Sequence, residues 1–210
     1  MTMEILLFSR EEMGNGDHEQ INQMFEMGLN IFHLRLPQLN RVRYESVLKG
    51  IKPEFRKRVV IHSHLGLIRK YQIGGIHLTE RIKKYPLRMN RLIEKVHSIQ
   101  GKLRISISCH SLKELVTLNK IFAYATLSPI FDSISKEGYR SQFDLKAVKD
   151  SISKTETKVV ALGGCDATKL KTIENIGFWG VGLLGAIWNK PDPVLAFQQF
   201  TSKIKEECNE

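Results

Sequence analysis

Eight short apolar segments recur along this chain of 210 residues, and segments with helical spacing lie between them. The short segments are rich in β-branched residues or Leu, which is typical of strands buried in a sheet. Regular alternation of strands and helices predicts an α/β fold with a parallel sheet. The predicted strands are Glu4–Phe8, Ile31–Leu36, Val59–Ile61, Gly75–Leu78, Arg104–Ile107, Tyr124–Leu127, Val159–Leu162 and Gly180–Leu184.

This alternation predicts a compact (β/α)₈ TIM barrel that forms a single domain over residues 1–210. A doubly wound open sheet is the alternative, but that fold usually has fewer strands. The sequence also lacks a GxGxxG motif after its first predicted strand. We therefore expect the closed barrel.

Helical spacing and end signals locate several of the predicted helices. Ser111 and Glu114 match a capping box, Asp166 places a carboxylate at a helix start, and Gly177 provides a stop. The predicted helices are Asp17–Met27, Ser111–Lys120, Asp166–Asn175 and Pro193–Ile204.

Four apolar runs in the second half end in small or polar residues. An apolar run with such an end is what a buried parallel strand looks like where it opens into a site. The four runs are ISISCHS (105–111), TLSPIFDSISKEG (126–138), VVALGGC (159–165) and GVGLLGAI (180–187). They predict a polar, phosphorylated ligand at one end of the barrel, with 129–142 as a loop that could close over it.

Composition is that of an ordinary globular protein, with 42% hydrophobic and 26% charged residues. No run approaches the roughly 20 apolar residues of a membrane span, and MTMEILLFSR is typical of a first strand rather than a signal peptide. We expect a cytoplasmic protein without membrane contact. The net charge of +10 comes from scattered Lys and Arg, which favours a solvated basic exterior over a nucleic-acid site.

The three cysteines, Cys109, Cys165 and Cys208, form no disulfide framework and no zinc motif. Cys109 precedes His110, which suggests a thiolate–imidazole pair or, alternatively, a packed thiol. Neighbours on a strand point to opposite faces, so only one of these two side chains can face the site.

The order of six motifs resembles that of the thiamine phosphate synthase/TenI family along essentially the full chain. The motifs are HLRLP (33–37), GGIHLTE (74–80), SISCHSLKE (106–114), LSPIFDSISK (127–136), ALGGC (161–165) and GVGLLGAI (180–187). The resemblance implies a TIM barrel, usually dimeric. Synthases of this family join thiazole phosphate to the pyrophosphate ester of hydroxymethylpyrimidine with Mg²⁺. TenI-type members aromatise a thiazole carboxylate phosphate by moving a proton.

The resemblance also implies roles for individual residues. His110 matches the histidine that TenI-type enzymes use as acid and base. Arg35 matches a pyrophosphate-binding arginine. The other expected substrate contacts are His62, Ser108, Ser133, Ser135 and Lys136, and the expected phosphate contacts are Gly163, Gly164, Gly182, Leu184 and Gly185.

The sequence departs from the synthases mainly at the metal site. Carboxylates that hold Mg²⁺ in synthases are replaced by His62, Ser63 and His64 and, later, by Arg81–Ile82. Glu80 is the only nearby carboxylate that could substitute. Pro37 replaces a lysine, which removes one pyrophosphate contact. We therefore expect no cofactor in a tautomerase, and Mg²⁺ only if the chain is a synthase.

His62, His64 and His77 also admit a zinc site, although structural or substrate-facing histidines are the preferred interpretation. The departures favour a TenI-like thiazole tautomerase that binds a phosphorylated thiazole. The alternatives are a thiamine phosphate synthase, which also takes a phosphorylated pyrimidine, and a non-catalytic binder of thiamine intermediates. We expect a homodimer and no nucleic-acid partner.

Overall fold

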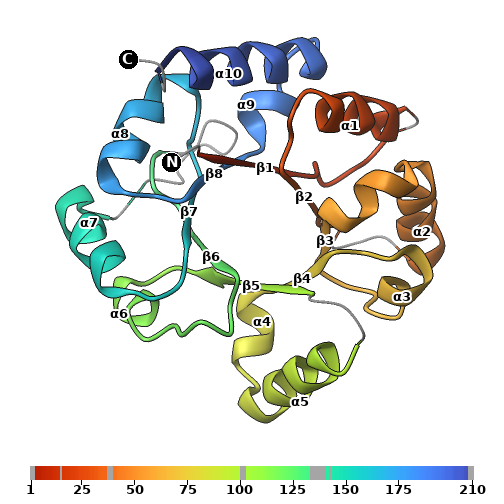
Figure 1. Cartoon of the computed structure of the whole chain (residues 1–210), viewed down its shortest axis with the longest axis horizontal. Coiled ribbons are helices and arrows are strands. Elements are labelled where there is room, and N and C mark those ends of the chain that lie inside the picture. Colours follow the sequence, from red (N-terminus) through yellow and green to blue (C-terminus); the bar gives the residue numbers. More distant parts are fainter. Residues whose placement is uncertain are drawn as a thin grey trace.

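Eight parallel strands close into a barrel in chain order in the computed structural model of this protein (Figure 1). The model describes residues 3–14, 16–36, 40–99, 103–132, 141 and 143–207. The strands are β1 (Glu4–Phe8), β2 (Ile31–Leu34), β3 (Val59–Ile61), β4 (Gly75–Leu78), β5 (Arg104–Cys109), β6 (Tyr124–Leu127), β7 (Val159–Leu162) and β8 (Gly180–Leu183). The predicted barrel is confirmed, and the open doubly wound sheet is excluded because β1 pairs with β8.

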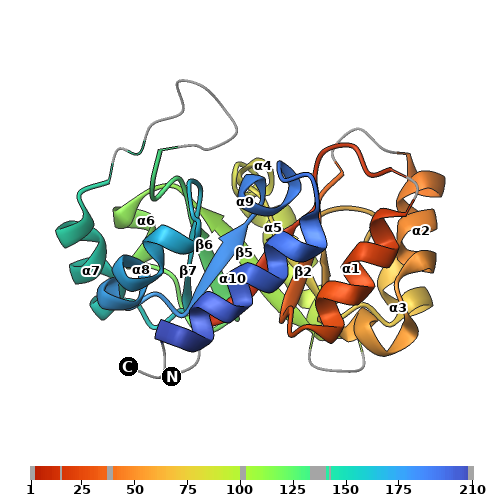
Figure 2. The same ribbon diagram turned by 90° about the horizontal axis from the view of Figure 1, so that it is seen from above.

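Helices surround the barrel on its outside, and α4 and α9 lie at the same end of it (Figure 2). They are α1 (Asp17–Glu26), α2 (Arg41–Gly50), α3 (Leu67–Tyr71), α4 (Glu80–Lys83), α5 (Pro86–His97), α6 (Leu112–Leu115), α7 (Leu145–Lys154), α8 (Leu170–Ile176), α9 (Gly185–Trp188) and α10 (Pro193–Glu207). Two 3₁₀ turns, η1 (Pro53–Arg58) and η2 (Ala167–Lys169), precede β3 and α8.

The predicted helix Ser111–Lys120 is wrong in its extent, because α6 ends at Leu115. Hydroxyls of Thr117 and Thr155 donate to the carbonyls of Glu114 and Leu115, at 2.8 and 3.0 Å, and so take acceptors that a longer helix would need. The capping box is also wrong. Ser111 precedes the helix but makes no side-chain cap bond.

The apolar residues form an inner and an outer core. Outward-facing strand residues such as Leu7 and Ile61 pack against the helices. The inner cluster comprises Leu6, Phe8, Ile31, Val60, Tyr124 and Val160. Because strand side chains alternate between faces, the remaining inward positions decide what the barrel can bind.

Barrel closure joins segments that are far apart in the chain. Glu4 to Leu7 of β1 pair in register with Gly180 to Leu183 of β8. The indole Nε1–H of Trp188 in α9 donates to the Phe8 carbonyl at 2.7 Å. The loop after β1 and the start of the last helices are thereby fixed around one end of the barrel.

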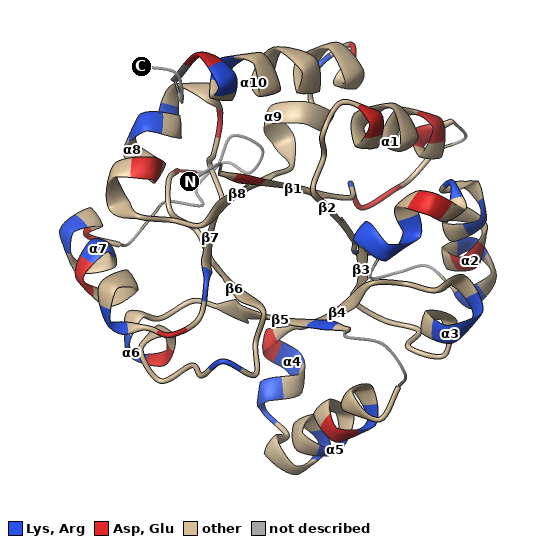
Figure 3. Ribbon diagram, viewed as in Figure 1, with Lys and Arg blue, Asp and Glu red and all other residues tan. Residues whose placement is uncertain are grey.

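Lys and Arg lie on helices all around the barrel, with Asp and Glu among them (Figure 3). This distribution agrees with a basic exterior without a single basic face over the described residues. No helix in that part of the chain is long and apolar enough to span a membrane.

Candidate functional site

A cavity of about 430 Å³ opens where the barrel strands end. Such a volume is in the range of small-molecule sites. Predicted site residues that line the cavity are Arg35, His62, Ser108, His110, Gly163, Gly164, Gly182, Leu184, Gly185 and, for the possible metal, Glu80. The other three, Ser133, Ser135 and Lys136, lie outside the described residues, as does Pro37.

Four glycines after or within β7 and β8, namely Gly163, Gly164, Gly182 and Gly185, form one side of the cavity, which we call the glycine wall. Gly163 and Gly164 have φ of 89° and 66°, in the left-handed region that favours glycine. A Cβ on Gly164 would lie 2.2 Å from the Asp132 carbonyl oxygen. The absent side chains let this turn pack closely against Pro129, Phe131 and Asp132, and the turn itself lines the cavity.

Four histidines form a second side of the site, which we call the histidine wall. His33 and His77 lie on β2 and β4, and His62 and His110 directly follow β3 and β5. Three of them line the cavity, and His33 is fully buried below it. The barrel therefore presents backbone on one side and imidazole rings on the other.

His110 follows β5 and is held by one well-defined hydrogen bond. Its Nδ1 lies 2.7 Å from the Ser128 carbonyl oxygen. A carbonyl only accepts, so neutral His110 carries its proton on Nδ1 and keeps a lone pair on Nε2. That Nε2 lies 3.9 Å from Glu80 Oε1. An exposed imidazole in this tautomer can accept a proton from a ligand in the cavity.

Cys109 is buried, in contrast to its neighbour His110. Burial raises the pKa of the Cys109 thiol to about 12, and the thiol lies 3.2 Å from the Ser111 carbonyl, to which it donates. A thiolate is the nucleophilic form, so this environment opposes the thiolate–imidazole interpretation. Cys109 is the packed thiol, and His110 is the member of the pair that faces the site.

Arg35 follows β2 and is exposed at the cavity. Its backbone is fixed by Ser9, whose hydroxyl donates to the Arg35 carbonyl and accepts from the Arg35 N–H, both at 2.9 Å. Burial is the main cause of the lowered pKa of His77, and the Arg35 charge adds to it. The guanidinium therefore contributes positive potential at the cavity, which favours anionic ligands.

The carboxylates at the cavity do not fit a Mg²⁺ site. Among the described residues, Glu11 and Glu80 line the cavity from the segments after β1 and β4. Glu80 forms an ion pair with Lys83, whose ammonium also pairs with Glu114. Mg²⁺ requires a close octahedral set of oxygen ligands, and a lysine beside the nearest carboxylate opposes a cation.

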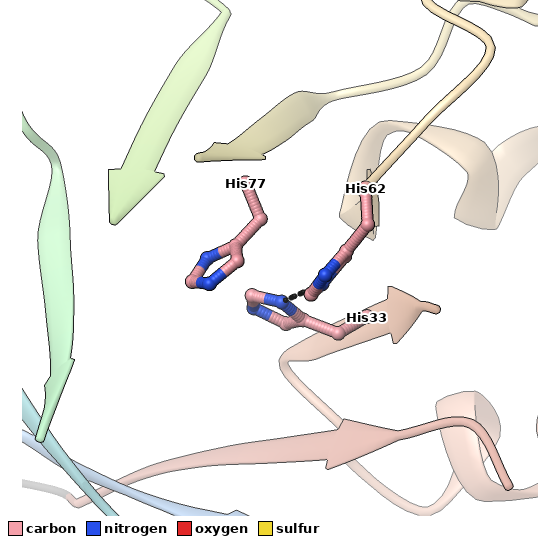
Figure 4. A group of neighbouring side chains, drawn as sticks. All are labelled: His33, His62 and His77. Atoms are coloured by element: carbon pink, nitrogen blue, oxygen red, sulfur yellow. Dashed lines mark hydrogen bonds between the residues drawn. The ribbon is translucent and has the colours of Figure 1, made fainter. Parts of the chain in front are cut away.

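Hydrogen bonds link the three inner histidines, His33, His62 and His77, to one another or to residues of the barrel interior, and Figure 4 shows the bond between His33 and His62. His33 Nδ1 lies 3.0 Å from His62 Nε2, and His33 Nε2 lies 2.6 Å from the Tyr124 hydroxyl. His77 bonds Ser106 and Ser108, at 2.9 and 2.8 Å. Burial lowers the pKa of His77 to about 3 and holds the pKa values of His33 and His62 well below their ordinary value. All three rings are therefore neutral near pH 7.

The alternative grouping of His62, His64 and His77 in one zinc site is wrong. β3 ends at Ile61, and His64 adopts φ of 55°, so it leaves the strand direction. The His64 ring packs against Tyr44 instead, with centroids 4.9 Å apart. The third member of the cluster is His33, whose ligand nitrogen lies within 4.8 Å of those of His62 and His77.

Several cavity residues were missed by motif reasoning. Thr126 and Ser128 lie two apart on and after β6, as Ser108 and His110 do on and after β5. Strand alternation alone would have placed them inside the barrel. The other missed residues are Phe8, Ser9, Glu11, Thr79, Pro129, Leu162, Cys165 and Ala186.

The chain is similar to proteins of one enzyme family. A family model described as thiamine monophosphate synthase matches residues 5–187. Thiamine-phosphate synthase of Desulfitobacterium hafniense (strain DSM 10664 / DCB-2) is 25% identical over 181 residues, which cover 84% of each chain. The solved structure of a thiamine phosphate pyrophosphorylase from Bacteroides thetaiotaomicron has a TM-score of 0.77 and 27% identity. It covers 99% of this chain and 98% of its own.

A second protein of similar sequence is the thiamine-phosphate synthase of Clostridium botulinum (strain 657 / Type Ba4). It is 27% identical over 177 residues, which cover 80% of this chain and 81% of that protein.

Proposed function

We propose that this chain, which belongs to the thiamine monophosphate synthase family, joins a thiazole phosphate to the pyrophosphate ester of hydroxymethylpyrimidine. We favour the synthase reaction, whereas the departures of this sequence from the synthase motifs favoured a TenI-like tautomerase. The preference changes because this chain matches most of the length of proteins that are named thiamine-phosphate synthase. A cavity with a glycine wall on one side and Arg35 on another is the observation that carries the proposal.

The glycine wall is the proposed phosphate site. Positive φ values at Gly163 and Gly164 turn the backbone after β7, and Gly185 begins α9 beyond β8. Backbone N–H groups in such turns donate to phosphate oxygens without the steric cost of a side chain. A thiazole phosphate bound here would place its ring toward the histidine wall.

Arg35 is the proposed contact for the pyrophosphate. In the reaction, the thiazole nitrogen forms a bond to the methylene carbon, and the bond between that carbon and the pyrophosphate oxygen breaks. The electron pair leaves with the pyrophosphate, so negative charge develops there. A guanidinium can offer two parallel hydrogen bonds to such an oxyanion and stabilises that charge.

A second candidate, thiazole tautomerisation, is favoured by the geometry of His110. Its Nε2 can take a proton from one ring position and return it to another, so the substrate changes in proton position only. The Ser128 carbonyl supports this role because it holds the other proton on Nδ1. The carboxylates that do not fit Mg²⁺ favour the same alternative.

One reaction mixture tests the main proposal. Purified protein receives thiazole phosphate, the pyrimidine pyrophosphate ester and Mg²⁺, and thiamine phosphate and pyrophosphate are both quantified. Equal amounts of the two products support the synthase. No product from a protein that binds thiazole phosphate overturns it, and the tautomerase assay then decides between isomerase and binder.

A matched pair of variants tests the role of Arg35. We expect Arg35→Gln to raise KM for the pyrophosphate ester about 10- to 100-fold, which corresponds to loss of a charged hydrogen bond. Arg41→Gln, on the exposed surface of α2, is the control for a lost positive charge. Equal effects of the two substitutions would assign the change to net charge rather than to a contact.

A further inference from the structure

Three imidazole rings from neighbouring strands converge at the floor of the cavity. His33, His62 and His77 belong to β2, the turn after β3, and β4, and each offers one nitrogen within 4.8 Å of the others (Figure 4). The closest pair, His33 Nδ1 and His62 Nε2, is separated by 3.0 Å. Two nitrogens on one tetrahedral zinc ion lie about 3.3 Å apart, since each Zn–N bond is about 2.0–2.1 Å. The three rings therefore need to move only slightly closer together to place their nitrogens around one ion.

An outer hydrogen bond fixes the tautomer of His77, and another holds the second nitrogen of His33. The Ser106 hydroxyl donates to the Ile76 carbonyl at 3.2 Å, so its oxygen accepts from His77 Nδ1–H. The His77 Nε2 lone pair then accepts from the Ser108 hydroxyl at 2.8 Å, a bond that a metal ion would replace. Tyr124 holds Nε2 of His33, which leaves Nδ1 directed at His62. A hydrogen bond to the second ring nitrogen is the usual support of a metal-bound histidine.

The His62 ring has incomplete bonding in the side-chain network. Its Nδ1 is buried and has no hydrogen-bond partner, one of two such side-chain atoms among the described residues. A buried ring nitrogen without a partner is costly. This atom is not the nitrogen that faces His33, which is His62 Nε2. The hydrogen-bonded cluster is thus complete at His33 and His77 and open at His62.

From this geometry we infer that His33, His62 and His77 form a binding site for one divalent transition metal ion of the zinc type. Imidazole nitrogens suit Zn²⁺ and Co²⁺, whereas Mg²⁺ prefers oxygen ligands. His62 and His77 line the cavity, so the fourth position of the ion faces the bound small molecule. Three protein ligands with one open position is the pattern of zinc sites that contact a water or a substrate. The site stands independently of the proposed synthase reaction.

Cobalt binding tests the site without any substrate. The full chain is stripped of metal, titrated with Co²⁺ and followed through the visible ligand-field bands of a tetrahedral nitrogen site. We expect one Co²⁺ per chain, displaced by Zn²⁺ and not by Mg²⁺. Absence of these bands, with no metal retained in the chain, overturns the inference and leaves a hydrogen-bonded histidine cluster.

Variants separate this site from other histidines. We expect His62→Ala to weaken Co²⁺ binding at least about 100-fold and Tyr124→Phe to weaken it about 10- to 100-fold. His64→Asn is the matched control, because it removes a histidine two residues away and Asn tolerates a positive φ. Equal loss in His64→Asn and His62→Ala would overturn the assignment.

A further test uses the wild-type chain, so its result does not depend on whether the variants fold. Anomalous diffraction at the zinc edge from wild-type crystals grown with Zn²⁺ should give a peak between the three rings. A peak elsewhere, with none between these rings, contradicts the site.

Discussion

The glycine wall and the histidine wall face the same cavity but are built in opposite ways. The glycine wall removes side chains, and its backbone is held in conformations that an L side chain rarely adopts. The histidine wall keeps large rings and holds their nitrogens through neighbouring hydroxyls and a carbonyl. The first arrangement suits recognition of an anion by backbone amides, and the second suits proton or metal chemistry.

The two walls also differ in how the chain encodes them. Gly163 and Gly164 are adjacent, so their turn is a local property of the sequence. His33, His62 and His77 are far apart in the chain and meet only because β2, β3 and β4 are neighbours in the barrel. Substitutions can therefore separate recognition at one wall from chemistry at the other.

The largest expected effect is at the histidine wall. We expect His110→Ala to lower the rate of proton transfer about 10²- to 10⁴-fold if the enzyme is a tautomerase, because a positioned acid or base contributes that much. Its exposed side chain predicts little change in folding. Single-turnover rates and the affinity for thiazole phosphate should be measured together. An undiminished isomerase rate in folded protein would remove His110 from the chemistry.

The next effect concerns the glycine wall. Gly164→Ala should lower the free energy of unfolding by more than the roughly 1–2 kcal/mol that a left-handed residue costs, because its Cβ also meets the Asp132 carbonyl. Gly177→Ala is the control, since Gly177 has φ of 94° but its Cβ would meet only Ile152, at 3.9 Å. Urea denaturation and titration with thiazole phosphate check both. An affinity for thiazole phosphate that is equally reduced in both variants contradicts the proposed phosphate site at the glycine wall.

The buried histidines predict acid sensitivity. The pKa of His77 is lowered by burial to about 3 in the folded chain, against about 6.5 when unfolded. Between these values the unfolded chain binds a proton that the folded chain does not. Stability is therefore full above about pH 6.5 and falls as pH falls, by about 1.4 kcal/mol per pH unit for each such histidine.

Chelator-treated protein allows this dependence to be measured without metal. Urea denaturation from about pH 7 to about pH 5 should give a shallower loss of stability in His77→Gln than in the wild type. His97→Gln removes an exposed histidine near the end of α5 and should leave the slope unchanged. Parallel slopes for all three proteins would show that His77 does not control acid stability.

The smallest expected effect concerns the carboxylate of Glu80, which lies beside His110 of the histidine wall. Glu80 pairs with Lys83 and is 48% exposed, so Glu80→Gln should change the free energy of unfolding by less than about 1 kcal/mol. The Mg²⁺ concentration that gives half-maximal activity should also stay the same, if Glu80 holds no metal. A large rise in that concentration would identify Glu80 as a Mg²⁺ ligand and contradict our assessment of the donor set.

Much of the fold could be predicted from the sequence, because each strand carries its own apolar signal. The bounds of Glu4–Phe8, Val59–Ile61 and Val159–Leu162 agree with those of β1, β3 and β7. The predicted helix Ser111–Lys120 was too long, because the hydroxyl of Thr155, from a distant segment, donates a hydrogen bond to the carbonyl of Leu115. Local spacing cannot reveal a competing bond of that kind.

In the candidate site, too, features set by local sequence could be predicted, and features set by contacts between distant segments could not. The glycines of the glycine wall could be predicted from runs of small residues after apolar segments. His110 could be predicted from its position after a strand. His33 could not be assigned to the cluster from spacing, because its partners lie on other strands and His64 had the more obvious spacing. Knowing the strand order and the alternation of inward positions would have been sufficient to choose His33 over His64.

The pairing of β1 with β8, and the bond from Trp188 to the Phe8 carbonyl, has a consequence for synthesis on the ribosome. β1 emerges before the other strands of the barrel and has one unpaired edge until β8 and α9 have left the exit tunnel. An unpaired parallel edge can associate with other chains. The pairing of β8 with β1 removes both open edges at once and so protects the nascent protein from association through them.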